Sequence, residues 1–405
     1  MTDITQCKSC KSKSIEVFFD FGKMPIVNNL LIKKKEKNKF FPLGLILCKK
    51  CYFVQTKNKL DPKKCFNKNY PYFSSTSKFW LNHAKDYCKK IEKKIKLKKG
   101  DQIVELASND GYLLKNFDKE KYRIFGVEPT KPAADIAIRD GIKTYNDFFS
   151  SSFVKKKKLK KTSKLIIANN VFAHVPNIND FTKGVHEMME DEGVFTIEFQ
   201  HLLNMLKFSQ FDTVYHEHYS YLSIIFLKNL FKKYDLKIWK IEKLNTHGGS
   251  LRVYVSKKKS NYKIQPSVKK IINEEILFGL KKIKTYKKLQ NDAKEIKNNL
   301  VEFFDKNQDK EIHAYGAAAK GIILLNYCGI TDKKIKYIYD AGKLKINKYI
   351  GGPKIKILQP NKIKNKKIDY MLILPWNLKK EIMQYIRKKN KKIKFIIAIP
   401  KLEIF

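Results

Sequence analysis

The sequence predicts an α/β protein with three parts: a small cysteine-bearing N-terminal domain, a doubly wound α/β domain, and a C-terminal α/β domain of the Rossmann-like kind. Two observations predict this organisation. Short apolar runs alternate with amphipathic stretches from residue 100 to about 255, and the same rhythm returns after residue 310, which is typical of parallel sheets covered by helices. The first 65 residues are instead rich in cysteine and turn formers and show no long helical period.

The pattern also predicts where each part begins and ends. We expect the cysteine-bearing domain over residues 1–65, the first α/β domain over 66–258, and a helical connection with the second α/β domain over 259–405. The strands expected in the first α/β domain are Ile103–Leu106, Ile124–Glu128, Leu165–Asn169 and Val194–Glu198. Those expected in the second are Ile312–Tyr315, Ile335–Tyr339, Asp369–Leu374 and Lys394–Ile399.

The overall composition excludes several classes of protein. With 405 residues, 43% of them apolar and 31% charged, the chain is neither collagen-like nor wholly disordered. Its apolar runs are shorter than the roughly 18 residues of a membrane-spanning helix. The first residues lack the basic-then-apolar layout of a signal peptide. We therefore expect a soluble, cytoplasmic protein without a membrane partner, and a monomer unless a self-association surface exists.

The net charge of +46 reflects 85 lysines and arginines against 39 acidic residues. Such an excess attracts anionic partners. Only Arg123, Arg139, Arg252 and Arg387 are arginines, however, and the lysines are spread along the chain. Sites that read phosphates or guanines favour the planar fork of arginine. We therefore expect no nucleic-acid partner, and interpret the lysines mainly as a compositional bias that also helps to attract an anionic substrate.

Two Cys-x-x-Cys pairs dominate the N-terminal domain, formed by Cys7 with Cys10 and Cys48 with Cys51. Each pair places two thiolates around a metal ion through one tight turn, and two pairs complete a tetrahedral zinc shell. Disulfides are the competing interpretation, but nothing in the sequence indicates an oxidising compartment. Four sulfur ligands leave no open position for water, so we expect a structural Zn²⁺.

A cofactor turn is predicted after the first strand of the middle domain. Acidic and small residues alternate from Glu105 through Ala107, Asn109 and Asp110 at the start of a helix, where backbone can approach a ligand closely. This is not the glycine pattern that binds a dinucleotide. Glu128 ends the next strand, where an acid accepts hydrogen bonds from two ribose hydroxyls. The combination favours a nucleoside without phosphate, such as S-adenosylmethionine.

The motifs together resemble the class I S-adenosylmethionine-dependent methyltransferases, and among them the C-methyltransferases that act on nucleotide-linked ketosugars. The shared pattern covers nearly the whole chain. It comprises the cysteine pairs, Tyr70-Pro-Tyr72-x-Ser-Ser, Glu105-x-x-x-Asn-Asp-Gly, Asn170-x-x-x-His174-Val, Tyr215-x-Glu217-His218, His247-Gly-Gly249 and Tyr315-Gly-Ala-x-Ala-Lys320. One position departs from the family pattern, because Ala107 stands where the family usually has glycine.

The resemblance implies a doubly wound methyltransferase sheet and a set of cofactor contacts. Glu105, Ala107, Asn109 and Asp110 would line the methionine end of S-adenosylmethionine. Glu128 would bind its ribose. The adenine would lie between Asp147 and Phe148, and Asn169 would lie near the methyl group.

The segment Tyr215–Tyr219 is the predicted reaction centre. Bond formation between carbon and a sulfonium methyl group needs a carbanion, which arises when a base removes a proton next to a ketone, and imidazole is a suitable base near neutral pH. The resemblance implies that His218 is this base and that Glu217 orients it or binds substrate. The remaining catalytic candidates are Tyr72 and Tyr215, as donors to the enolate oxygen, and His174, as a sugar contact. A zinc site at His216 and His218 is the alternative, but no third ligand stands out.

The C-terminal domain opens with a small-residue turn that ends at Lys320. The turn carries no acid of its own, so a phosphate fits at the following helix N-terminus. The resemblance implies that a nucleotide diphosphate is held between the domains. From its charge we expect Arg252 to help clamp the diphosphate, and from its place at a strand end we expect Asn377 to face the same cleft.

We therefore predict an enzyme that methylates a carbon of a nucleotide-diphosphate-linked ketosugar through an enolate. Three alternatives remain open at this point. The first is methylation of oxygen or nitrogen on a sugar or small molecule. The second is a lysine-rich RNA-binding protein with a zinc ribbon, and the third is a scaffold that binds the cofactor without turnover.

Overall fold

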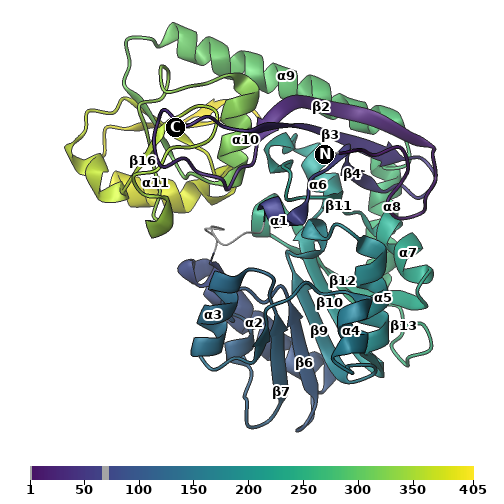
Figure 1. Cartoon of the computed structure of the whole chain (residues 1–405). Coiled ribbons are helices and arrows are strands. Elements are labelled where there is room, and N and C mark those ends of the chain that lie inside the picture. Colours follow the sequence, from purple (N-terminus) through teal and green to yellow (C-terminus); the bar gives the residue numbers. More distant parts are fainter. Residues whose placement is uncertain (1, 66–72) are drawn as a thin grey trace.

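The computed structural model describes residues 2–65 and 73–405, which form three main β-sheets and one two-stranded pair. A seven-stranded sheet from the middle of the chain forms the lower part of the molecule in Figure 1, and the yellow-green C-terminal sheet and the purple N-terminal strands lie above it. Tyr72, a predicted catalytic residue, lies outside the described residues. Among the described helices, none combines the length and the apolar character needed to cross a bilayer.

The middle sheet has the strand order β12-β13-β10-β9-β6-β7-β8. Its strands are β6 (Gln102–Leu106), β7 (Arg123–Val127), β8 (Thr144–Tyr145), β9 (Ser163–Asn169), β10 (Met189–Gln200), β12 (Leu236–Leu244) and β13 (Ser250–Lys257). The first five are parallel, and β13 is antiparallel to both of its neighbours. The winding reverses between β6 and β9, and ligands of doubly wound sheets bind at the carboxyl ends of the strands at that point.

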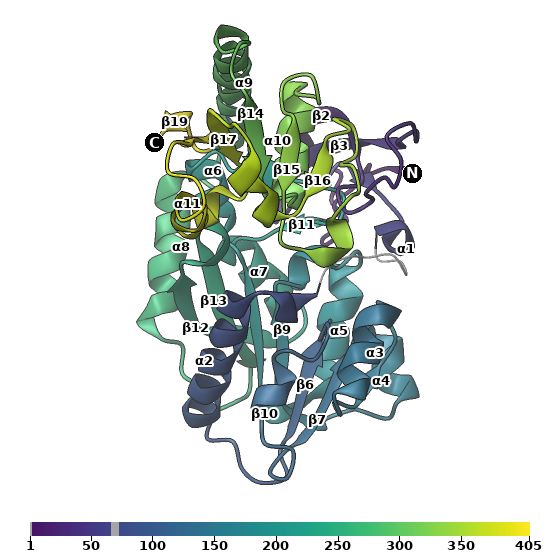
Figure 2. The ribbon, with the colours of Figure 1, turned by 90° about the vertical axis from the view of Figure 1, so that its left-hand side faces the viewer.

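Helices cover both faces of this sheet, as expected for buried parallel strands. They are α2 (Lys78–Ile95), α3 (Lys131–Arg139), α4 (Ser151–Lys156), α5 (Ile178–Met188), α6 (Leu202–Lys207), α7 (Ile224–Lys232) and α8 (Pro266–Phe278). Successive β9 residues point to opposite faces. Ile167 packs with α2, and Ile166 packs with α5, so these helices lie on opposite sides of the sheet (Figure 2). The predicted doubly wound sheet is confirmed.

The N-terminal part forms a four-stranded sheet in the order β11-β4-β3-β2. Its strands are β2 (Ile15–Pro25), β3 (Phe40–Cys48), β4 (Val54–Thr56) and β11 (Ser220–Tyr221), beside the pair β1 (Thr2–Asp3) and β5 (Asn58–Lys59) and the short helix α1 (Pro62–Cys65). Strand β11 comes from the middle of the chain and pairs with β4. The zinc-bearing part is therefore joined to the middle domain by backbone hydrogen bonds.

The C-terminal sheet has the order β16-β15-β14-β17-β18-β19, with all pairs parallel except the last. Its strands are β14 (Ile312–Tyr315), β15 (Tyr337–Tyr339), β16 (Lys356–Leu358), β17 (Tyr370–Ile373), β18 (Lys394–Ile397) and β19 (Glu403–Ile404). Its helices are α9 (Ile283–Lys306), α10 (Ala319–Cys328) and α11 (Lys379–Arg387). This order is that of a Rossmann-like sheet. Long helix α9 runs beside β2 at the top of Figure 1, where the tilted rings of Phe18 and Tyr286 contact each other with centroids 5.2 Å apart.

Candidate active site

The four cysteines of the N-terminal part converge as the sequence predicts. Their Sγ atoms all lie within 4.8 Å of one another. Cys7 and Cys51 are 3.6 Å apart, and Cys10 and Cys48 are 3.5 Å apart. Tetrahedral zinc–thiolate geometry requires an Sγ–Sγ separation of about 3.8 Å. The hydrogen bond from Cys51 lowers the pKa of Cys7 to about 5, while burial raises the pKa of Cys48 to about 11, so metal binding would displace protons that the cluster otherwise keeps. The residues therefore fit a structural Zn²⁺.

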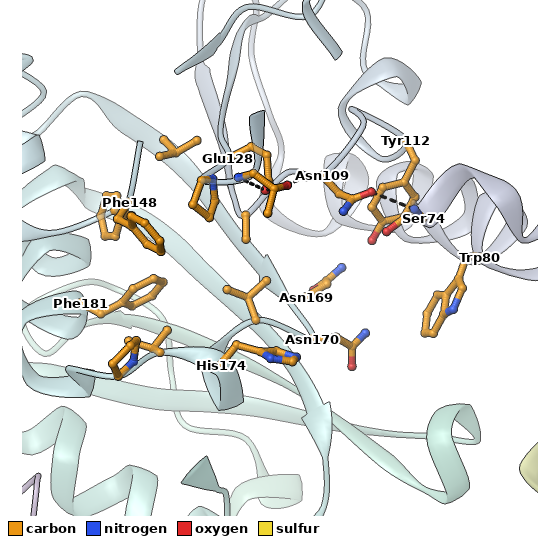
Figure 3. A pocket seen from close by; sticks show the side chains of 18 of the residues that line it. Ser74, Trp80, Asn109, Tyr112, Glu128, Phe148, Asn169, Asn170, His174 and Phe181 are labelled. Atoms are coloured by element: carbon orange, nitrogen blue, oxygen red, sulfur yellow. Dashed lines mark hydrogen bonds between the residues drawn. The ribbon is translucent and has the colours of Figure 1, made fainter. Parts of the chain in front are cut away.

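A pocket opens at the carboxyl ends of β6, β7 and β9 (Figure 3). Five predicted cofactor residues line it: Ala107, Asn109, Glu128, Phe148 and Asn169. Other lining residues include Ser74, Trp80, Asn170, His174, Phe181 and His247. Phe148 and Phe181 lie together at one end, and Trp80 lies at the other (Figure 3). The aromatic end suits a flat base, and the polar middle suits a ribose.

Glu128 is fixed in the middle of this pocket by backbone donors. Its Oε2 accepts a hydrogen bond from Asn109 N at 2.8 Å, and its Oε1 accepts one from Thr130 N at 2.7 Å and another from the Thr130 hydroxyl. Asn109 Oδ1 in turn accepts from Ser74 N at 2.8 Å. Burial raises the pKa of Glu128 above its ordinary value. The carboxylate is thus held in one orientation, ready to accept hydroxyl donors.

Two further acids lie buried behind the turn. Within residues 2–65 and 73–405, Glu105 Oε2 and Asp110 Oδ1 have no hydrogen-bond partner, and neither does Asn169 Oδ1 at the end of β9. Burial, together with the charges of Asp110 and Glu128, raises the pKa of Glu105 well above its ordinary value. Asp110 Oδ2 accepts from Ser75 N at 3.1 Å, but the buried carboxylate oxygens without partners are costly unless a cation pairs with them. The ammonium and sulfonium groups of S-adenosylmethionine are such cations, so the residues present fit this cofactor.

Asp147 is not among the residues that line this pocket. Its side chain is exposed, and its Oδ1 accepts a hydrogen bond from Phe148 N at 2.8 Å. Phe181 occupies the wall opposite Phe148 instead. Phe181 lies in helix α5 with the spacing of an ordinary core residue, so no sequence signal marks it as part of the pocket.

The backbone conformation of the turn at residue 107 favours glycine. Ala107 has φ 51°, a left-handed conformation that costs a non-glycine residue about 1–2 kcal/mol. We expect Ala107→Gly to raise the free energy of unfolding by about 0.5–1 kcal/mol, because relief of strain exceeds the entropy cost of glycine. Urea unfolding curves measure this change. Ala134→Gly, in helix α3, is the matched control and should lower stability. Equal destabilisation by both changes would contradict the strain argument.

The predicted base, His218, lies next to the pocket. Its Nδ1 is 2.9 Å from the Thr213 carbonyl oxygen, which can only accept, so Nδ1 carries the proton and Nε2 keeps a lone pair. The ring stacks on Tyr215 at 4.0 Å between centroids and meets His174 edge-on at 4.6 Å. His174 lines the pocket and donates from Nδ1 to the Glu217 carbonyl oxygen at 3.0 Å.

The imidazoles around the pocket are held neutral. Burial, reinforced by His174 and Lys320, lowers the pKa of His218 well below its ordinary value. Burial also lowers the pKa of His174 to about 4 and that of His247 to about 4. A neutral imidazole with an open Nε2 is the form that accepts a proton. The arrangement is therefore chemically able to act as a general base at pH 7.

Glu217 is almost completely buried, with 1% of its surface exposed. Asn28 Nδ2 lies 2.8 Å from both of its carboxylate oxygens. His216 instead turns away, with Nε2 at 3.3 Å from the carbonyl oxygens of Phe41 and Pro42. The three consecutive polar residues thus have different environments, and Glu217 contacts the N-terminal part of the chain.

The C-terminal domain approaches the same centre. Lys320 Nζ lies 4.4 Å from the Trp376 ring centroid and 3.5 Å from Asn377 Oδ1. Trp376 Nε1 donates to Asp212 Oδ2 at 2.7 Å, which connects η8 (Trp376–Leu378) to η4 (Phe211–Thr213) of the middle domain. Burial raises the pKa of Asp212 to about 6. Lys320 and Asn377 therefore lie at the interface that faces the imidazoles.

Comparison with known proteins agrees with this geometry. Three family profiles match in sequence order: "Putative zinc binding domain" over residues 7–66, "Methyltransferase domain" over 79–241, and "C-methyltransferase C-terminal domain" over 245–400. The C-methyltransferase NovU of Streptomyces niveus is 28% identical over 404 residues, which cover 98% of this chain and 96% of NovU. The chain thus carries a methyltransferase domain and a C-methyltransferase C-terminal domain behind a zinc-binding domain, which is the organisation of an S-adenosylmethionine-dependent C-methyltransferase.

Solved structures resemble parts of this C-methyltransferase. The PH0226 protein of Pyrococcus horikoshii OT3 is 14% identical, covers 46% of this chain and 95% of its own, and has a TM-score of 0.38. A methyltransferase of Clostridium acetobutylicum ATCC 824 is 13% identical, with coverages of 44% and 91% and a TM-score of 0.35.

Arg252 of the C-methyltransferase does not form the expected diphosphate clamp. Its guanidinium is buried, lies 4.6 Å from the Tyr87 ring centroid, and donates to Glu198 Oε2 at 2.8 Å. His83 Nε2 also lies 2.9 Å from that oxygen. Arg252 and Glu198 are register partners on β13 and β10, so the positive charge neutralises a buried acid inside the protein.

The C-methyltransferase also differs from expectation at the turn before Lys320. Asp340, from the end of the neighbouring strand β15, accepts a hydrogen bond from Ala317 N at 2.8 Å. An acid thus occupies the position where a phosphate was expected at the turn. Lys320 instead extends toward Trp376 and the domain interface.

Proposed function

We propose that this C-methyltransferase methylates a carbon next to a ketone in a nucleotide-diphosphate-linked sugar. His218 removes the proton from that carbon. The observation that carries the proposal is the neutral His218 imidazole, whose Nδ1–H is bound to the Thr213 carbonyl oxygen and whose ring contacts a residue of the cofactor pocket.

The protein groups around His218 suit formation of an enolate. His218 Nε2 takes the proton, and the electron pair of the broken C–H bond moves onto the ketone oxygen. Tyr215, stacked on His218, is the proposed donor to that oxygen, a contribution worth about 3 kcal/mol for one well-placed donor. S-adenosylmethionine, when bound, supplies an electrophilic methyl group. The new C–C bond would form at the former C–H carbon as the carbonyl is restored, while the methyl–sulfur bond breaks and its electron pair stays on the sulfur of a neutral thioether.

The charge at the interface favours an anionic substrate. Lys320 is largely buried, and burial lowers its pKa while the carboxylate of Asp212 opposes the shift. The Lys320 charge also lowers the pKa of His218 and that of His247, so Lys320 is close enough to influence both rings. We propose that Lys320 and Asn377 bind the sugar nucleotide. Because sugar nucleotides and S-adenosylmethionine are cytoplasmic metabolites, we also propose a cytoplasmic site of action.

Transfer of labelled methyl from S-adenosylmethionine to a panel of nucleotide-linked 4-ketosugars tests this proposal. The matched controls are the same sugar nucleotides with the ketone reduced to a hydroxyl. We expect label in a new C–CH₃ group of at least one ketosugar and none in the reduced controls, because an alcohol does not acidify its neighbouring C–H. Label on oxygen or nitrogen, or equal transfer to the reduced controls, would contradict the proposal.

A further inference from the structure

We propose that Asn28 is a positioning residue of the reaction centre, and that the zinc-bearing part completes this centre by holding Glu217. The proposal rests on the role proposed above for His218. It assigns to the N-terminal part a function in turnover beyond its own folding. No sequence motif includes Asn28, and its place in the site is visible only in the fold.

The contact between Asn28 and Glu217 is close and buried. The amide nitrogen lies 2.8 Å from Oε1 and 2.8 Å from Oε2 of a carboxylate that is 1% exposed. A hydrogen bond to a buried charged group is worth more than one between neutral groups, and loss of the donor leaves a desolvated charge behind. The Asn28 amide therefore restricts where the Glu217 carboxylate can lie.

The backbone of the zinc-bearing part holds the same loop. Strand β11 follows the Tyr215–Tyr219 segment directly and pairs with β4, with Ser220 opposite Gln55. Thr56 N donates to the Tyr219 carbonyl oxygen at 3.3 Å. The loop that carries His218 is thus attached on both sides of Glu217, by His216 to the β3 backbone and by β11 to β4.

Glu217 is also connected to the imidazoles. Its carbonyl oxygen accepts from His174 Nδ1 at 3.0 Å, and His174 packs against His218 at 4.6 Å. A shift of Glu217 therefore moves both rings. Because a base must lie within hydrogen-bond reach of the proton it removes, loss of Asn28 should reduce the rate of the chemical step more than it reduces binding of cofactor.

The segment that carries Asn28 also contacts the C-terminal domain. Leu31 pairs with Tyr349 in an isolated bridge, and Asn38 Oδ1 accepts from Gly352 N at 2.8 Å. Residues 28–38 therefore touch both the reaction loop and the domain that bears Lys320. Asn28 lies at the end of this connection that faces the reaction centre.

The test compares Asn28→Asp, Asn28→Gln and Asn29→Ala. Aspartate keeps the shape of asparagine but replaces donors with a second negative charge, glutamine keeps the amide, and exposed neighbour Asn29 is the matched control. We expect Asn28→Asp to lower kcat by about 10–100-fold, the range typical of groups that orient catalytic side chains. Glutamine should restore part of this loss. Zinc content and the Kd for S-adenosylmethionine should stay at wild-type values, while the melting temperature of Asn28→Asp should fall by a few degrees because a buried charge loses its donor.

A second readout needs no substrate. The ¹⁵N resonances of His218 in histidine-labelled protein should shift in Asn28→Asp and not in Asn29→Ala. An unshifted His218 would overturn the proposal, as would an unchanged kcat, or a loss of kcat explained by loss of zinc or by unfolding at the assay temperature. If wild-type enzyme methylates no ketosugar, the proposed substrate fails, while the resonance shift still decides the role of Asn28.

Discussion

His218→Ala is expected to lower turnover by about 10²–10⁴-fold, the usual contribution of a general base, and to leave the affinity for S-adenosylmethionine unchanged. The reason is geometric. His218 lies beside the pocket rather than in its wall, with Nδ1 bound to the Thr213 carbonyl oxygen, so its removal deletes the proton acceptor without deleting a cofactor contact. Calorimetry with the cofactor and methyl-transfer rates measure the two quantities separately.

The control and the pH dependence sharpen this prediction. His186→Ala, in the last turn of helix α5 and outside the lining of the pocket, should have wild-type turnover. Because burial depresses the pKa of His218, its basic form persists below the ordinary histidine range near pH 6.5. The acid limb of kcat/KM should therefore fall below that range. A His218→Ala enzyme with wild-type turnover would remove His218 from the role of base.

Cys48→Ser is expected to abolish stoichiometric zinc binding and most of the turnover. One thiolate of four is lost, and structural zinc contributes about 10–16 kcal/mol of apparent binding free energy in small zinc domains. Cys48 ends strand β3, which pairs with β4, so loss of the metal should loosen the sheet that holds the reaction loop. Metal analysis and thermal unfolding measure the effect.

Cys328→Ser provides the matched control. This cysteine is buried in the C-terminal domain, in the core that contains Leu324 and Ile330. It should keep one zinc per chain and lose little turnover. A Cys48→Ser protein with full zinc content and normal turnover would contradict the assignment of the metal site.

The sequence predicted those features of the fold and the site that depend on residues close together in the chain. The paired cysteines, the two parallel sheets and the turn from Glu105 to Asp110 each lie within a short stretch whose spacing carries the signal. Glu128 was predicted because the carboxyl ends of adjacent parallel strands meet at one edge. In each case the chemistry could be inferred before the tertiary structure.

Long-range contacts could not be predicted in this way. Asn28 and Glu217 are 189 positions apart, and an asparagine after a strand carries no signal of a catalytic neighbour. The role of Arg252 depends on the antiparallel register that places it opposite Glu198, which strand patterns do not specify. Asp340 reaches the Ala317 turn from another strand for the same reason. The predictions made from charge alone, that Arg252 clamps a diphosphate and that a phosphate binds at the Ala317 turn, are therefore not supported by the fold.

Exchange of solvent deuterium into a nucleotide-linked ketosugar is the most direct test of enolate formation by His218. The substrate is incubated in D₂O with the enzyme and S-adenosylhomocysteine, so that no methyl group is available, and deuterium is located by NMR. We expect exchange at one carbon next to the ketone with wild-type enzyme and with His186→Ala, and loss of that exchange with His218→Ala. Methyl transfer to a ketosugar without any enzyme-dependent exchange, or undiminished exchange in His218→Ala, would contradict the account.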